Sequence, residues 1–511
     1  MSSLNREILR IAIPSILANI TVPLVGMVDL AVAGHLDGSA AAFIGAIAVG
    51  SMLFDLLYWN FAFLRAGTGG LTAQAFGRGD FAQCGRILVR GLGLALGFAL
   101  LVLLIQWPFV KLALMAVDCS PEVRELATQY FFIRIWAAPA TISLMAFRGW
   151  FIGMQDGVSS MVADLVVNAS NIILSLALSL GVGSWPGLGF RGVALGTLIA
   201  QYAGLAYAVA RVALKYRRMA FEGFGVADVA AAFRREEMKS YFSMNTDLFL
   251  RSLGLMGIYI GFTVISARYG DLLLSASAII MKLLMLFSYF TDGFAYAGEA
   301  LTGKYIGRGS REATRQSVRM VFFWSMAVGV LFIGIYAFAG VPILHLITSD
   351  AMVVETCRHF LPWLILMPPL GCAAFAWDGI YEGATATRPV RNASLGAALS
   401  FFALWFGLKT LLLPRFSHLT EGAALDSVAS GAALGTFESE AALPGGAALG
   451  PFESEVALTG GAALGSLTDP AAIGIAAIHC LMAAYFAHLL FRTVYLSILY
   501  RRSILDTPFT K

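Results

Sequence analysis

Ionisable residues inside long apolar stretches are the positions of this sequence at which chemistry could take place. A charged side chain at the centre of a membrane helix costs at least ~2.5 kcal/mol, so such residues usually have a function or a partner. Eight residues fit this description: Asp29, Asp55, Arg65, Asp164, Arg251, Lys282, Asp292 and Glu299. The carboxylates among them could carry protons or bind cations. For all of them except Asp29, a structural ion pair or an interfacial position is the alternative interpretation.

Asp29 is the strongest candidate among these residues. It follows Arg10 by 19 residues in the first apolar stretch, which at ~1.5 Å per residue places it in the outer part of a bilayer. No cation lies near it in its own helix, and burial disfavours the charged form of a carboxyl group. We therefore expect an external proton to neutralise Asp29.

Two prolines, Pro14 and Pro23, interrupt the same stretch. Pro23 cannot donate a hydrogen bond to the carbonyl of Asn19, so the helix can bend there. A bendable helix with one carboxylate near its outer end predicts a switch. When Asp29 is neutral, the helix bends inward around Pro14 or Pro23, and substrate is released outside. The alternative is that prolines are simply commoner in membrane helices than in soluble ones.

The elements that must position these residues are membrane helices. Apolar residues make up 59% of the chain and charged residues 13%, whereas soluble proteins have roughly 25% charged residues. The mean hydropathy is +0.78, and about twelve apolar stretches approach the ~20 residues needed to cross a bilayer. The composition excludes a water-soluble fold and predicts an all-α membrane protein with twelve transmembrane helices.

A shift of 230 residues superimposes the second half of the sequence on the first. Leu71-Thr72 and Gly77-Arg78-Gly79 recur as Leu301-Thr302 and Gly307-Arg308-Gly309. With six helices in each copy, both copies enter the membrane in the same orientation. This predicts two six-helix lobes, related by a pseudo-two-fold axis along the membrane normal, with a central cavity between them. We expect an N-terminal lobe over 1–218, a linker over 219–240, a C-terminal lobe over 241–502 and a tail over 503–511.

An insert interrupts the second copy at 415–469. Beyond Pro414 the best shift becomes 282, and the inserted segment is itself a repeat of 15 residues, in which Gly431-Ala-Ala-Leu-Gly recurs as Gly446-Ala-Ala-Leu-Gly. Residues 417–468 contain acidic side chains but no Lys or Arg, as is typical of an external loop. Its Gly and Ala content and lack of periodicity predict little regular structure.

The distribution of charge predicts the orientation of the chain. Most of the 35 Lys and Arg residues fall on one side if the N-terminus is inside, so we expect both termini in the cytoplasm of a bacterium, with the protein in the inner membrane. The net charge of +4 reflects this asymmetry and requires no nucleic-acid partner.

The five cysteines have no paired spacing, and no catalytic constellation is visible. We therefore expect no metal, no cofactor and no enzymatic activity.

Several motifs, in this order, resemble one transporter family. They are Pro23-Leu-Val-Gly-Met-Val-Asp29, Gly34-His35-Leu36, Phe63-Leu64-Arg65, Gly70-Leu-Thr-Ala-Gln-Ala75, Asp292-Gly-Phe-Ala295 and Trp377-Asp378-Gly379. Together they resemble the DinF-like branch of the multidrug and toxic compound extrusion (MATE) transporters, over both lobes and outside the insert. The resemblance implies a twelve-helix antiporter that expels amphipathic, often cationic compounds by using proton or sodium gradients.

The resemblance also implies a cation-coupling site. Asp29 matches the carboxylate of the first helix that the family uses for coupling. Asn171 begins a sequence similar to the N-x-x-L-D pattern of the fifth helix, but Ser175 replaces its Asp, and Thr197 resembles a further polar member of the site. The lost carboxylate makes sodium less expected, since a hard cation prefers carboxylate oxygen. We predict proton coupling through Asp29, with Asn171 and Thr197 as hydrogen-bonding neighbours.

The repeat further predicts a cytoplasmic gate. The shift of 230 places Arg148 opposite Asp378, near the cytoplasmic ends of the fourth and tenth helices. An ion pair between them would close the inner side, and two independent interfacial residues are the alternative.

We predict a monomeric, proton-coupled exporter of small amphipathic compounds. The alternatives are a flippase for a lipid-linked precursor, an exporter of another endogenous metabolite, or a sodium-coupled MATE exporter.

Overall fold

A computed structural model describes residues 3–36, 39–115, 117, 119–411 and 470–506. In this part of the chain, twelve helical segments are long and apolar enough to cross a membrane. The first lobe contains α1 (Ser3–Gly34), α2 (Ala40–Tyr58), η1 (Trp59–Phe61), α3 (Phe63–Arg78), α4 (Phe81–Met115), α5 (Pro121–Arg134), η2 (Ile135–Ala137), α6 (Ala138–Gly153), α7 (Gly157–Leu180), α8 (Phe190–Arg211), η3 (Val212–Tyr216) and α9 (Arg217–Ala220). The second contains α11 (Arg235–Ala267), α12 (Asp271–Gly307), α13 (Arg311–Ile347), α14 (Ala351–Gly383), α15 (Thr387–Leu411), α17 (Pro470–Tyr500) and η4 (Arg501–Asp506).

The outer surface of both lobes is apolar. Leu104 on α4 is 71% exposed, and Phe338 on α13 is 91% exposed. Apolar clusters hold the helices together, with Phe131 of the first lobe and Phe287 of the second fully buried, and one cluster packs α1 against α12. Apolar residues on both the inside and the outside are what a bilayer requires of a helical bundle. The predicted all-α membrane fold is therefore confirmed.

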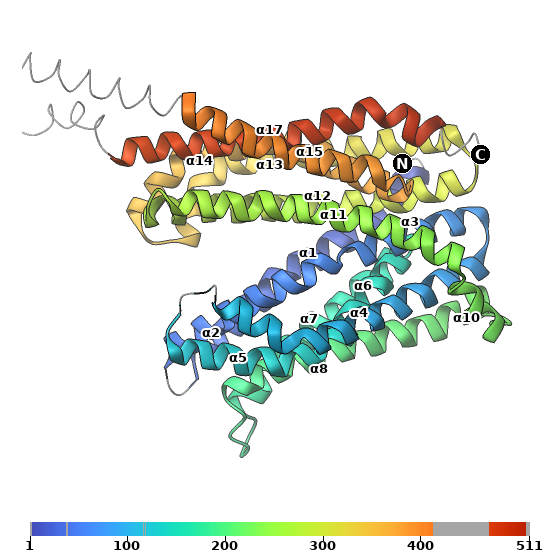
Figure 1. Cartoon of the computed structure of the whole chain (residues 1–511), viewed down its shortest axis with the longest axis horizontal. Helices are drawn as coiled ribbons and strands as arrows, with labels where there is room; N and C mark the ends of the chain where they lie inside the picture. Colours follow the sequence, from blue (N-terminus) through green and yellow to red (C-terminus); the bar gives the residue numbers. More distant parts are fainter. Residues whose placement is uncertain (1–2, 37–38, 116, 118, 412–469, 507–511) are drawn as a thin grey trace, which may run out of the picture.

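The two lobes meet at one end of the molecule and separate toward the other (Figure 1). The closest approach is between α3 and α12, where glycines bring the backbones together. A side chain at Gly77 would lie 2.1 Å from the carbonyl oxygen of Lys304, and one at Gly307 would lie 2.1 Å from that of Gln74. These two contacts are related by the shift of 230, so the pseudo-two-fold axis passes between α3 and α12.

The linker between the lobes lies at this same end and is attached to the first lobe. It includes α10 (Val226–Ala232), and Arg86 on α4 pairs with Asp228 at 3.1 Å. Arg90 on α4 donates hydrogen bonds to the carbonyl of Ala232 and to Glu237 at the start of α11, both at 2.7 Å. Both ends of the described chain also lie at this end of the molecule (Figure 1).

A polar cluster in the loop between α6 and α7 marks the same end. Asp156 caps α7 by accepting hydrogen bonds from the backbone N–H and hydroxyl of Ser159, and it also accepts bonds from Lys215 and Tyr216. Burial favours the neutral acid, but the hydrogen bonds from Lys215, Ser159 and Tyr216 outweigh it and hold the pKa of Asp156 at about 2. The cluster fixes the start of α7 and the turn after α8. The predicted insert at 415–469 lies outside the described residues.

Candidate functional site

The first candidate site is a buried polar cluster within the first lobe that contains Asp29. Asp29 on α1 is 6% exposed, and Asn171 and Ser175 lie four residues apart on α7, so they share one face of that helix. Asn171 donates its side-chain amide to the hydroxyl of Thr197 on α8 at 2.8 Å, and Thr197 donates to the carbonyl of Val193 at 3.2 Å. The structure thus brings together three helices and the three residues that the sequence assigned to this site, Asp29, Asn171 and Thr197, with Ser175 beside Asp29.

The cluster contains several buried oxygen atoms. Within the described chain, Asp29 Oδ1 and Asn171 Oδ1 are buried without a hydrogen-bond partner, and the hydroxyl of Ser175 lies beside Asp29. A buried acceptor without a donor costs about 1–3 kcal/mol, so this arrangement favours the uptake of a proton or a cation. Either would be held by the carboxylate of Asp29 and by neutral oxygens around it.

A cation from another helix also acts on Asp29. Arg134 at the end of α5 is close enough to interact with it electrostatically. Arg134 donates a hydrogen bond to the hydroxyl of Tyr130 at 2.9 Å and lies over the ring of Phe54 at 4.6 Å. Arg134 was not predicted from the sequence, because the only signal was a single Arg at the end of a short polar helix within the fourth span.

α1 connects this polar cluster to the second lobe. The helix is continuous from Ser3 to Gly34 and includes both Pro14 and Pro23. The side chain of Asn168 on α7 donates a hydrogen bond to Thr21 at 2.6 Å, and Asn19 donates to the carbonyl of Tyr289 on α12 at 3.2 Å. A movement of α1 is therefore transmitted to both lobes.

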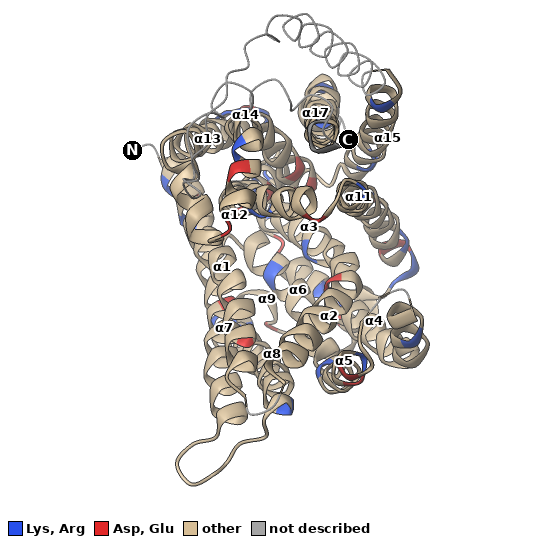
Figure 2. Cartoon of the chain, turned by 90° about the vertical axis from the view of Figure 1, so that its left-hand side faces the viewer, with Lys and Arg blue, Asp and Glu red and all other residues tan. Residues whose placement is uncertain are grey.

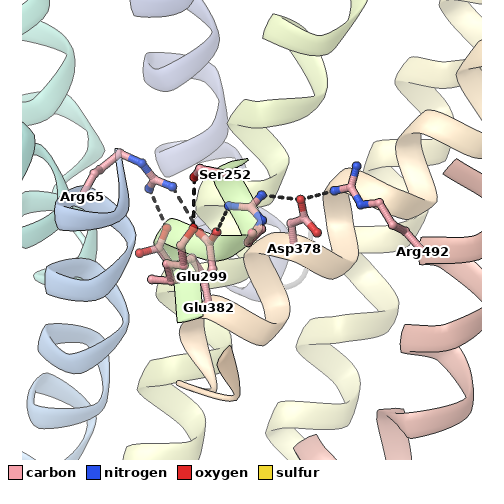
Figure 3. A network of polar contacts seen from close by, with 8 residues as sticks. Arg65, Ser252, Glu299, Asp378, Glu382 and Arg492 are labelled. Atoms are coloured by element: carbon pink, nitrogen blue, oxygen red, sulfur yellow. Dashed lines mark hydrogen bonds and ion pairs between the residues drawn. The ribbon is translucent and has the colours of Figure 1, made fainter. Parts of the chain in front are cut away.

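The second candidate site is a row of alternating charges near the pseudo-two-fold axis (Figure 3). Arg65 on α3 pairs with Glu299 on α12 at 2.7 Å and with Glu382 on α14 at 3.2 Å. Arg251 on α11 pairs with Glu382 at 2.9 Å and with Asp378 on α14 at 2.5 Å. Asp378 also pairs with Arg492 on α17. We call these six residues the charge row.

The charge row is deeply buried and balanced in formal charge. The side chain of Glu299 is 0% exposed, and that of Arg492 is 2% exposed. Three arginines face three carboxylates, which is the condition under which charges tolerate a low-dielectric interior. Arg65 is the one member from the first lobe, and its guanidinium also lies over the ring of Tyr296 at 4.3 Å. The Arg65 contacts therefore join the two lobes.

The predicted gate between Arg148 and Asp378 is not formed in this conformation. Arg148 instead pairs with Asp164 at 2.5 Å inside the first lobe, and Asp378 is already bound by Arg251 and Arg492. The prediction of a pair between them is wrong here because equal depth in the membrane does not fix which neighbour a side chain faces. The charged contacts between the lobes instead come from Arg65 and from Glu7 on α1, which pairs with Lys304 on α12 at 2.7 Å.

The remaining predicted residues lie around the space between the lobes. Asp55 on α2 and Lys282 on α12 are both exposed, and they are close enough to interact across the lobes. Asp292 on α12 is half-buried, and it interacts electrostatically with Arg65. Figure 2 marks the positions of charged residues along the helices of both lobes. Glu382 was missed, although its position four residues after Asp378 places both on one helix face.

Comparison with known proteins agrees with this architecture. A model of the MatE family matches residues 14–177 and 248–404. The chain is 34% identical over 426 residues to DNA damage-inducible protein F of Escherichia coli, covering 81% of this chain and 89% of the relative. It is 24% identical to a probable multidrug resistance protein NorM of Thermotoga maritima, covering 79% and 83% of the two chains.

Solved structures share the fold at low identity. A MOP superfamily transporter from Pyrococcus furiosus superimposes with a TM-score of 0.72 at 15% identity, covering 97% of both chains. An outward-facing multidrug resistance MATE family transporter superimposes with a TM-score of 0.70 at 16% identity, covering 97% of this chain and 96% of that one. Together with its twelve apolar helices, these matches show that the chain belongs to the MatE family and is a multi-pass multidrug and toxic compound efflux transporter, not an enzyme.

Proposed function

We propose that the protein exports amphipathic, often cationic organic compounds across a bacterial inner membrane in exchange for protons. Both termini are cytoplasmic in this proposal, so the end at which the lobes meet is the inner side. Proton coupling is supported most directly by the burial of the Asp29 carboxylate, whose Oδ1 has no hydrogen-bond partner within the described chain.

A proton on Asp29 changes its interactions in two ways. The neutral acid gains an O–H that can donate to the free oxygen of Asn171 or Ser175. It also loses its attraction to Arg134 on α5. Because α1 also binds Tyr289 of the second lobe through Asn19, protonation alters the relation between the lobes, which is how a local charge biases a two-state carrier.

The space between the lobes suits a cationic aromatic compound. Asp55 and Asp292 offer two carboxylates, and Trp59 and Tyr259 bring aromatic rings from opposite lobes to 6.1 Å. Aromatic faces and carboxylates together bind organic cations. A flippase for lipid-linked precursors would instead be expected to present free basic residues. Arg251 is engaged by two carboxylates, which supports the export of smaller compounds.

Proteoliposomes with an imposed proton gradient or an imposed sodium gradient test this proposal. We expect Asp29→Asn to bind dye but to export it poorly and without pH dependence, whereas Asp29→Glu retains partial activity. Wild-type rates in Asp29→Asn vesicles, with the same response to a collapsed proton gradient, would contradict the proposal and direct attention to Asp55, Asp292 or Glu299.

Sodium coupling is the second candidate, because a buried carboxylate oxygen with the neutral oxygens of Asn171 and Ser175 beside it also suits a hard cation. Ser175→Asp separates the two mechanisms by adding a second carboxylate. Under proton coupling, wild-type export follows the proton gradient alone, and Ser175→Asp does not make it dependent on sodium. Export driven by sodium in the wild type, and strengthened in Ser175→Asp, would favour the sodium mechanism.

A further inference from the structure

A groove runs along the first lobe between α4 and α8, near the end at which the lobes meet. Its volume is about 350 Å³, and its lining includes Leu92 on α4, Phe147 on α6 and Val209 on α8. All of its lining residues belong to the first lobe and the start of the linker. The groove is therefore separate from the space between the lobes.

The groove opens toward the bilayer. Leu96 and Leu100 follow Leu92 at intervals of four residues, so they lie on the same face of α4, and they are 54% and 59% exposed. On the other wall, Val209 is itself 51% exposed. These side chains belong to the apolar outer surface of the lobe, so acyl chains of the membrane are the molecules that meet the groove.

The equivalent position in the second lobe is filled by aromatic rings. The shift of 230 relates Leu92 to Phe322 and Phe147 to Trp377. The rings of Phe322 and Trp377 lie 4.7 Å apart, and the ring of Tyr500 lies 5.1 Å from that of Trp377. Two of the side chains that line the groove are thus smaller than their equivalents. The groove is a property of the first lobe and is not required by the repeated fold.

An arginine without a partner lies at one end of the groove. Arg217 lines the groove where α8 and η3 lead into α9, and it is exposed. Its guanidinium has no hydrogen bond or ion pair within the part of the chain that the structure describes. The two preceding cations differ in this respect, because Lys215 binds Asp156 and Arg211 donates to the hydroxyl of Ser159 at 2.9 Å.

The residues around Arg217 have the character of a membrane interface. Leu214 is 86% exposed and Met219 is 38% exposed, and Arg218 is exposed beside them. Exposed apolar and basic side chains in one short segment are typical of the boundary between acyl chains and headgroups. Arg217 follows Val209 by eight residues, or about 12 Å along a helix. The groove therefore extends from the acyl region to a cation at headgroup level.

We propose that this groove binds one anionic phospholipid, with an acyl chain between α4 and α8 and the phosphate on Arg217. The charge favours an anionic lipid, since a zwitterionic headgroup brings its own ammonium next to the arginine. Glu222, the nearest carboxylate along the sequence, makes no ion pair with Arg217 within the described chain. The bound lipid joins α4 to the start of the linker. Its assignment to the inner leaflet rests on the proposed orientation, whereas its binding depends on neither export nor Asp29.

Native mass spectrometry of the full chain, titrated with phosphatidylglycerol or with phosphatidylethanolamine of the same acyl chains, tests the site. We expect one phosphatidylglycerol to bind more tightly than phosphatidylethanolamine. Arg217→Gln should weaken phosphatidylglycerol about fivefold, which is the value of one basic residue near an anionic headgroup, and should remove the preference between the two lipids. Arg218→Gln is the matched control. It removes the same charge from the next residue, which does not line the groove, so it should leave both affinities unchanged.

Two further variants test the acyl part of the groove. Ala213→Trp enlarges an exposed lining residue, so it should preserve folding while filling the groove, and we expect it to weaken both lipids. Leu92→Phe introduces the residue that the second lobe has at this position and should act in the same direction. Phosphatidylglycerol should also raise the melting temperature of the wild type more than that of Ala213→Trp.

Equal phosphatidylglycerol affinities for wild type, Arg217→Gln and Ala213→Trp would overturn the site. Equal losses in Arg217→Gln and Arg218→Gln would indicate a general effect of surface charge and would also overturn it. Displacement of the lipid by a transported dye, with the same sensitivity to Ala213→Trp, would identify the groove as a substrate site instead. Normal export by Asp29→Asn would contradict the coupling proposal and leave these lipid affinities valid.

Discussion

Replacing Arg65 by Gln should weaken the contact between the lobes at the end where they meet. Arg65 binds Glu299 at 2.7 Å and Glu382 at 3.2 Å, and both carboxylates belong to the second lobe. Removing one partner of a buried pair costs about 3–5 kcal/mol, because the other charge stays buried without compensation. Glu382 keeps Arg251 at 2.9 Å, and the side chain of Arg65 is 19% exposed, so we take the lower limit. About 3 kcal/mol corresponds to roughly a hundredfold change in the equilibrium between this conformation and one open at that end.

Double electron–electron resonance, which measures the distance between two spin labels, can detect such a change. Spin labels at Asp80 and Arg388, two exposed residues at this end of opposite lobes, should show a longer distance in Arg65→Gln than in wild type. Arg251→Gln is the matched control. Arg251 is 18% exposed and makes two ion pairs, but both are inside the second lobe. It should lower the melting temperature without changing the distance distribution. Identical distributions in wild type and Arg65→Gln would refute the assignment of Arg65 as a connection between the lobes.

Three other changes test separate parts of the structure. The pKa of Asp156, about 2, lies below the pKa of ~3.9 that an Asp has in an unfolded chain. The ionised Asp156 therefore stabilises the folded protein above pH ~4, and this contribution is lost as the pH falls toward 2. Asp156→Asn should therefore lower the stability at pH 7 by about 1–2 kcal/mol and flatten the acid limb of a melting-temperature profile; an unchanged profile would contradict this. Gly307→Ala should open the end at which the lobes meet, because the new carbon would lie 2.1 Å from the carbonyl of Gln74, and it should lengthen the distance between the spin labels at Asp80 and Arg388, whereas a side chain at Gly334 meets nothing within 4 Å and Gly334→Ala should give the wild-type distance. Deletion of 417–468 should leave folding and dye export nearly intact, since external loops tolerate length changes; loss of folded protein would refute it.

The sequence predicted the fold well because its two strongest signals are physical requirements. Twelve apolar stretches must be helices in a bilayer, and a repeat with six helices per copy must place both copies in the same orientation. The contact between Asn171 and Thr197 also followed from the sequence once the resemblance had placed their helices in one site. Each of these inferences depends only on the order of the helices and on membrane depth.

The ion pairs were harder to predict because they depend on the rotation of each helix about its axis. Arg148 and Asp378 occupy equivalent depths, but α6 turns Arg148 toward Asp164 on α7 of its own lobe. Arg492 could not be assigned to Asp378 because α17 follows the insert, and the shift that aligns it is different. A single sequence gives the depth of a charge in the membrane and leaves its partner undetermined.

The repeat explains why the charge row is asymmetric. A residue next to a two-fold axis faces the equivalent residue of the other repeat. Gly69 and Glu299, which are 230 positions apart, are such a pair. Oε1 of Glu299 lies 2.0 Å from where a side chain at Gly69 would begin, so the axis has room for one side chain only. Two carboxylates there would also repel each other. One copy must therefore be small while the other carries the charge, and Arg65, whose own equivalent is Ala295, neutralises that charge from the opposite lobe. Any movement that separates the lobes at the axis has to break this pair.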